Sequence, residues 1–139
     1  MSANSTERTE RETYHFSRVM VAPFEEAIER VIAALQHEGF GVLTDIDVKA
    51  TMKKKLDVDF RRYRILGACN PPLAHQALQV EDKIGTMLPC NVVVQELEGG
   101  RIEVSAVDPV ASMQAVGNPA LLDIAHTVQT KLKAVISAL

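Results

Sequence analysis

A tight hairpin in the second half of the chain constrains the fold more than any other feature. Apolar strands are predicted at residues 87–97 and 101–107, and Glu98, Gly99 and Gly100 supply the turn that joins them. A connection this short pairs two antiparallel strands, because parallel neighbours need a crossover of a dozen or more residues. The sheet is therefore expected to be antiparallel or mixed, and a doubly wound nucleotide-binding fold is not indicated.

Two long amphipathic helices are predicted to cover this sheet. The first begins at Pro23 and ends at Gly39, a residue suited to the left-handed backbone of a helix end. The second follows Asn118, which is predicted to cap it, and continues towards the C-terminus. Its wide apolar face consists of Leu121, Leu122, Ala125, Val128, Leu132, Val135, Ile136 and Leu139.

Three further strands are predicted at residues 13–21, 40–48 and 61–69. In the second of them, Ile46 is expected on the same face as the other apolar residues, and Asp45 on the opposite face. The element order predicts an α+β fold, with an antiparallel or mixed sheet of about five strands packed against two long helices.

The remaining segments are shorter. Residues 49–57 are predicted to form one or two helical turns, and Asn70 is predicted to cap a helix of about two turns. Residues 108–117 are expected to form a loop with apolar side chains that lies on another part of the protein. The continuous run Val92–Val94 predicts a strand that is buried on both faces.

Composition limits the class of protein. A chain of 139 residues with 47% hydrophobic and 24% charged residues predicts a single globular domain, at 13–139, after a disordered N-terminal arm at 1–12. A net charge of −3 and 4% aromatic residues argue against nucleic-acid binding. The chain shows no secretory signal and no membrane-spanning segment, so a cytoplasmic protein with reduced cysteines is expected.

Two short stretches each pair a cysteine with an asparagine. They are Gly67-Ala68-Cys69-Asn70-Pro71, before a predicted helix, and Leu88-Pro89-Cys90-Asn91-Val92, at the start of a strand. With the Gly-Gly hairpin, this pattern resembles domain-of-unknown-function family 302. The resemblance implies a small α+β fold similar to the TATA-binding-protein-like arrangement, commonly a homodimer, and it brings no established reaction. It also implies that the matching residues mark a family site: Cys69, Asn70, Pro71, Pro89, Cys90 and Asn91.

The two cysteines also suggest a chemistry on their own. Cys69 precedes a predicted helix start, where free N–H groups favour a thiolate, so it is expected to be the more acidic and faster-reacting thiol. If strands 61–69 and 87–97 are antiparallel neighbours, Cys90 lies near Cys69. Two thiolates could then bind a soft metal, form a reversible disulfide or carry sulfur. Their spacing matches no zinc motif, and packing in the core is the simpler alternative.

Nearby polar residues extend this candidate site. His75 follows one turn into the helix and could be a third ligand or a base, although an exposed position is the simpler alternative. Asn70 and Asn91 could contact a ligand, but a helix cap and a turn are the ordinary uses of asparagine.

The resulting hypothesis is a homodimeric module that binds or senses a small ligand or a soft metal ion at Cys69 and Cys90. The alternatives are a thiol-dependent enzyme or sulfur carrier, and an interaction domain whose cysteines are structural. No catalytic motif is present. The homodimer is also predicted from the apolar face of the last helix and the apolar residues of 108–117, which one small sheet is not expected to cover. No nucleic-acid or membrane partner is expected.

Overall fold

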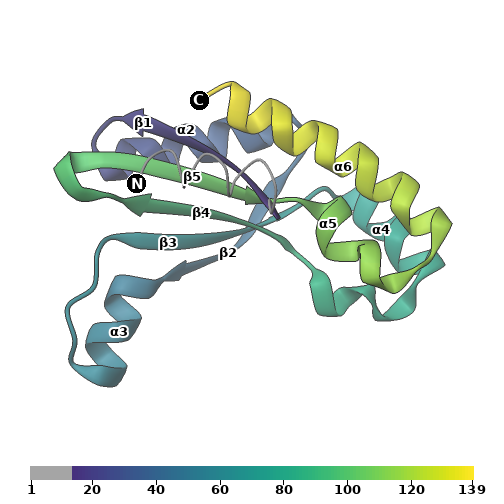
Figure 1. Ribbon diagram of the computed structural model, residues 1–139, viewed down its shortest axis with the longest axis horizontal. Coiled ribbons are helices and arrows are strands. Elements are labelled where there is room, and N and C mark those ends of the chain that lie inside the picture. The colour runs from purple at the N-terminus through teal and green to yellow at the C-terminus, as the bar shows by residue number, and fades with distance from the viewer. Residues whose placement is uncertain (1–13) are drawn as a thin grey trace.

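The computed structural model describes residues 14–139, and the arm predicted at 1–12 lies outside them. Five strands form one sheet in the order β1-β5-β4-β3-β2, and every neighbouring pair is antiparallel (Figure 1). The predicted α+β class and the hairpin between β4 and β5 are confirmed. The strands are β1 (His15–Val21), β2 (Gly41–Asp47), β3 (Tyr63–Cys69), β4 (Cys90–Glu96) and β5 (Arg101–Val107).

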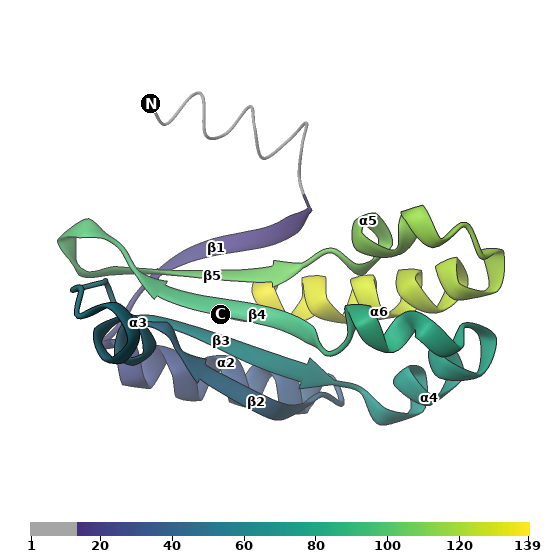
Figure 2. The same ribbon diagram turned by 90° about the horizontal axis from the view of Figure 1, so that it is seen from below.

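Both predicted long helices, α2 (Phe24–His37) and α6 (Pro119–Ser137), lie on the same face of the sheet (Figures 1 and 2). Asn118 caps α6 as expected, because its side-chain oxygen accepts a hydrogen bond from the backbone N–H of Ala120 at 3.1 Å. The core between this face and the two helices includes the fully buried Ile102 and Leu132. Seen from below, the strands lie in front of α2 and α6 (Figure 2).

The first half of α6 extends beyond the end of the sheet (Figure 1). There it packs against α4 (Pro71–Val80) and α5 (Pro109–Met113) and forms a second apolar cluster, which consists of Ala77, Ile84, Met113, Leu121 and Ala125.

Residues 108–117 were expected to be a loop that lies on another part of the protein; they do pack against α6, but the prediction of a loop is wrong. They form α5 and a 3-10 turn (Gln114–Val116), because Asp108 caps α5 and Met113 is buried against α6. The apolar residues that suggested a homodimer are thus largely covered within one chain. The homodimer stays a prediction, without this support.

The face assignment in β2 is also wrong. A β-bulge lies between Val42 and Thr44 and shifts the register by one residue. Beyond the bulge, Asp45 pairs with the buried Leu66 and so lies on the helix-covered side, whereas Ile46 is on the other side and is 49% exposed. A one-residue shift moves every later side chain to the opposite face.

Two other segments differ in detail from their predictions. Val92 and Val94 are fully buried but Val93 is only half-buried, so β4 is closely packed on one face alone. Residues 82–87 form a 3-10 helix, η1 (Asp82–Met87), and strand β4 begins only at Cys90.

The helix predicted at 49–57 is present as α3 (Val48–Leu56). No helix of residues 14–139 is both long enough and apolar enough to span a membrane.

Candidate functional site

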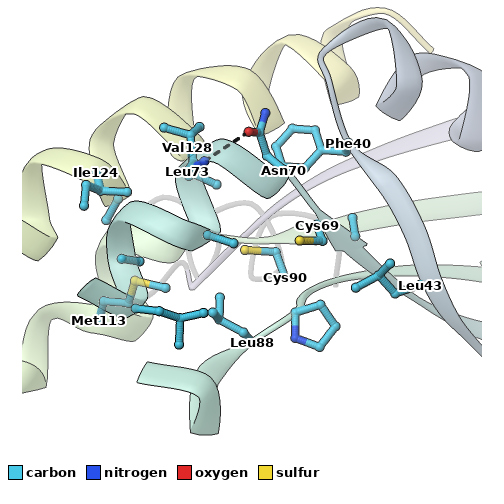
Figure 3. A pocket seen from close by; sticks show the side chains of 16 residues that line it. Phe40, Leu43, Cys69, Asn70, Leu73, Leu88, Cys90, Met113, Ile124 and Val128 are labelled. Atoms are coloured by element: carbon cyan, nitrogen blue, oxygen red, sulfur yellow. Dashed lines mark hydrogen bonds between the residues drawn. The ribbon is translucent and has the colours of Figure 1, made fainter. Parts of the chain in front are cut away.

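A pocket of about 260 Å³ lies where the two apolar clusters meet, at the ends of β3 and α4 (Figure 3). The residues that line it come from the sheet, α4, α5, α6 and the connections between them. They are Phe40, Leu43, Ala68, Cys69, Asn70, Leu73, Ala74, Ala77, Leu78, Leu88, Pro89, Cys90, Met113, Ile124, Ala125 and Val128.

Small side chains explain why this space is not filled. Four of the lining residues are alanines, and they come from β3, α4 and α6. An alanine on each of three converging elements leaves a gap that a leucine at the same position would occupy. The pocket therefore results from the small residues that the sequence places on the surrounding elements.

Both cysteines line this pocket. Ala68 pairs with Cys90 across β3 and β4, which places Cys69 one residue beyond the paired position. Cys69 is half-buried and Cys90 is buried, and neither forms a disulfide. Burial raises the pKa of the Cys90 thiol to about 11, and the negative charge of a nearby Cys69 thiolate adds to the rise. At neutral pH, Cys90 is therefore an uncharged thiol.

Asn70 holds the junction between β3 and α4. Its side-chain oxygen accepts a hydrogen bond from the backbone N–H of Leu73 at 3.4 Å, which confirms the predicted cap. Its side-chain nitrogen donates to the carbonyl oxygen of Glu38 at 3.5 Å, and so connects this junction to the end of α2. The structural role of Asn70 therefore accounts for both polar atoms of its side chain.

The same cap weakens the expected effect of the helix on Cys69. The first two helical residues, Pro71 and Pro72, have no backbone N–H, and the N–H of Leu73 is bonded to Asn70. The first turn of α4 therefore does not offer these donors to a thiolate at Cys69. The reason given for a more reactive Cys69 does not hold, although Cys69 is still the more exposed of the two thiols.

His75 and Asn91 lie outside the pocket. His75 is exposed on α4, and Asn91 is exposed on β4, where it pairs with Gly67. Within residues 14–139, no group of three or more histidine, cysteine, aspartate or glutamate side chains is placed to hold a metal ion. Cys69 and Cys90 thus remain a pair without His75 as a third ligand.

Comparison with known proteins identifies the family. The family model "Domain of unknown function DUF302" matches residues 16–139. The chain belongs to the DUF302 family. A crystal structure described as an uncharacterized conserved protein DUF302 from Bacillus stearothermophilus is 31% identical in sequence and has a TM-score of 0.83. The match covers 90% of this chain and 97% of that one. No curated protein matches.

Several lining residues of this DUF302 domain were not identified from the sequence. Met113 belongs to the segment expected to be a loop, Val128 was assigned only to the apolar face of the last helix, and Ile124 was not singled out at all. For Val128, the signal is an apolar face on α6 that is longer than the sheet it covers.

Gly67 was also missed as a residue that shapes the site. A Cβ atom at this position would collide with Thr44 Oγ1 and lie 2.6 Å from Pro89 Cγ. A glycine inside a strand is the sequence signal for such a close approach.

Proposed function

We propose that this DUF302 domain binds a small, uncharged, apolar ligand in the pocket beside Cys69 and Cys90. The observation that supports the proposal is the chemistry of the lining. Apart from the two thiols, Asn70 has the only polar side chain among the 16 lining residues, and its polar atoms are engaged in hydrogen bonds. A charged ligand would lose its hydration without gaining a partner from these side chains.

The volume of the pocket limits the size of the ligand. An apolar cavity of about 150 Å³ holds benzene or xenon, and pockets for drug-sized molecules begin at about 300 Å³. At about 260 Å³, this pocket lies between the two. The expected ligand is therefore a neutral aromatic or short aliphatic molecule, somewhat larger than benzene.

A soft metal ion is the second candidate. The observation that favours it is that Cys69, Cys90 and Met113 all line the pocket, and thiolate and thioether sulfur are the ligands that copper(I) prefers. It ranks below the apolar ligand because binding requires the thiolate, which the raised pKa of Cys90 disfavours. No such observation supports a thiol enzyme, since the candidate base His75 lies outside the pocket.

The test is a titration of the isotope-labelled protein with indole, followed by the NMR shifts of backbone amides. We expect saturable shifts at lining residues of α4 and α6. The variant Ala74→Phe, which fills the pocket from α4, should weaken binding by about tenfold or more, equivalent to about 1.4 kcal/mol. The matched control is Ala33→Phe, on an exposed face of α2, which should bind as the unaltered protein does.

The outcomes separate the candidates. Shifts that do not saturate, or that are equal in Ala74→Phe and the unaltered protein, would contradict an apolar ligand site. Ala74→Leu repeats the test with a smaller side chain if Ala74→Phe does not fold. Anaerobic binding of copper(I) that is lost in Cys69→Ala, in a protein that does not bind indole, would favour the second candidate.

A further inference from the structure

The backbone brings Cys69 and Cys90 close enough for a direct bond. Strands β3 and β4 are antiparallel neighbours, and Cys69 lies one residue beyond Ala68, the partner of Cys90. The strand spacing and the rise per residue together place the two Cα atoms about 6 Å apart. Disulfides in proteins join Cα atoms that are about 4.4–6.8 Å apart, so this separation is suitable.

Both cysteine side chains line one pocket. Cys69 is the last residue of β3, where it pairs with Gly41 of β2, and the chain continues through Asn70 into α4. Cys90 is the first residue of β4. Figure 3 shows both side chains among the residues that line the pocket.

The two thiols differ in their exposure. Cys69 is only partly buried and lies on a pocket that is open to solvent, whereas Cys90 is 6% exposed. A small oxidant from solution therefore reaches Cys69 first. Cys90 is protected from the oxidant but lies beside the sulfur that the oxidant modifies.

We propose that Cys69 and Cys90 form a redox-sensitive thiol pair, which a hydroperoxide converts into an intrachain disulfide by reacting first with Cys69. The proposal concerns the same pocket as the proposed ligand-binding function, and it rests on that function only in the following point. A ligand in the pocket covers Cys69 and so protects the pair from oxidation.

The reaction has two steps. The Cys69 thiolate attacks one oxygen of the hydroperoxide, the O–O bond breaks, and an alcohol (water, from hydrogen peroxide) leaves with a proton as Cys69 becomes a sulfenic acid. Cys90, which is a neutral thiol at neutral pH, then releases its proton as its sulfur attacks the Cys69 sulfur, the S–O bond breaks, and hydroxide leaves as water with that proton. The two thiols lose two electrons and two protons, and the hydroperoxide takes up both.

The test uses hydrogen peroxide, intact-mass measurement and thiol counting on the full chain. We expect the unaltered protein to lose the mass of two hydrogen atoms, to lose both free thiols, and to recover them with dithiothreitol. Cys90→Ala should stop at a sulfenic acid on Cys69, which dimedone traps. Cys69→Ala should keep its Cys90 thiol. Alanine suits both positions because the pocket is apolar.

Three results would overturn the proposal. They are a gain of oxygen by the unaltered protein without a cross-link, a cross-link only between two chains, and equally fast oxidation of Cys69→Ala and Cys90→Ala. Proteolytic peptides that contain both cysteines, found only before reduction, would support it.

A last measurement separates this proposal from ligand binding. Indole at about ten times its dissociation constant should slow oxidation by about tenfold, in proportion to the free pocket. An intrachain disulfide with no protection by indole would support the thiol pair and count against the apolar ligand site. Saturable indole binding without a disulfide would overturn the thiol pair and leave the ligand site supported.

Discussion

At the scale of single residues, the two cysteines show that a difference in burial gives two thiols in one pocket different reactivities. Both thiols line one pocket, but Cys69 is partly exposed and Cys90 is buried, with a pKa raised to about 11. A thiolate is the reactive form of cysteine, so the two positions have different reactivities in the same small volume. Neither sequence neighbourhood shows this difference, because the groups that bury Cys90 come from distant parts of the chain.

We predict that alkylation of Cys90 depends on pH up to an unusually high value. In Cys69→Ala, only Cys90 can react, and its rate should rise about tenfold for each pH unit until the pH reaches the pKa of about 11. In urea, the same variant should instead level off near the ordinary pKa of about 8.5. A folded-state profile that matches the one in urea would show that burial does not control this thiol.

Gly67 gives a second prediction at this scale. Gly67→Ala should lower the free energy of unfolding by about 1–3 kcal/mol, because the new methyl group collides with Thr44 and Pro89. The matched control is Gly85→Ala, where nothing lies within 4 Å of the new atom. Urea denaturation of both variants measures the difference. Equal stability of the two variants would show that β2 and Pro89 move apart to make room.

At the scale of elements, the sequence correctly predicted the features that depend on residues close together in the chain. The caps at Asn70 and Asn118 and the hairpin at Gly99 were identified correctly, because each depends on residues close in sequence. The bulge beyond Val42 was missed because it depends on pairing with β3, and α5 was missed because five residues are too few to show a helical period.

The cap on α4 can be tested directly. Asn70→Ala removes the acceptor for the Leu73 N–H and the donor to the Glu38 carbonyl, and should cost about 1 kcal/mol of stability. Asn91→Ala is the matched control, because Asn91 is exposed and should change stability by less than about 0.5 kcal/mol. Thermal denaturation of both variants gives the comparison. If the two variants melt together, the cap contributes nothing.

The ion pair between β2 and β3 gives a pH-dependent prediction. The side chain of Arg64 donates a hydrogen bond to Asp45 at 2.7 Å and so lowers the pKa of that carboxyl group in the folded state. Asp45→Asn should therefore lower stability at neutral pH, by less than about 1 kcal/mol because the pair is partly exposed. This difference should be present above the unfolded-state pKa and disappear as the pH falls through the lowered folded-state pKa.

The control for this pair is Asp59→Asn. Asp59 is 93% exposed and lies 3.8 Å from Lys53, so its replacement should have little effect at any pH. Urea midpoints measured from neutral to acidic pH give both curves. A stability difference for Asp45→Asn that stays constant down to the most acidic pH would contradict the assigned pairing.

At the scale of the whole molecule, one helix joins two apolar clusters with the pocket between them. Leu132, Val135 and Ile136 of α6 pack in the cluster on the sheet, and Leu121 and Ala125 pack in the cluster with α4 and α5. The pocket could not be predicted from the sequence because its lining comes from segments far apart in the chain, and it exists only once α6 has been placed across both clusters.

We predict that this shared helix makes the described domain unfold as one unit. Leu121→Ala in the second cluster and Leu132→Ala in the first should each lower the free energy of unfolding by about 2–5 kcal/mol, since both side chains are fully buried. Leu56→Ala, at a position that is 65% exposed on α3, is the matched control and should have little effect. If α6 couples the clusters, calorimetry of each variant should show a single unfolding transition at a lower temperature. A separate early transition in Leu121→Ala, with the main one unmoved, would instead mean that the pocket end of the molecule unfolds alone, and the pocket would then open without loss of the sheet.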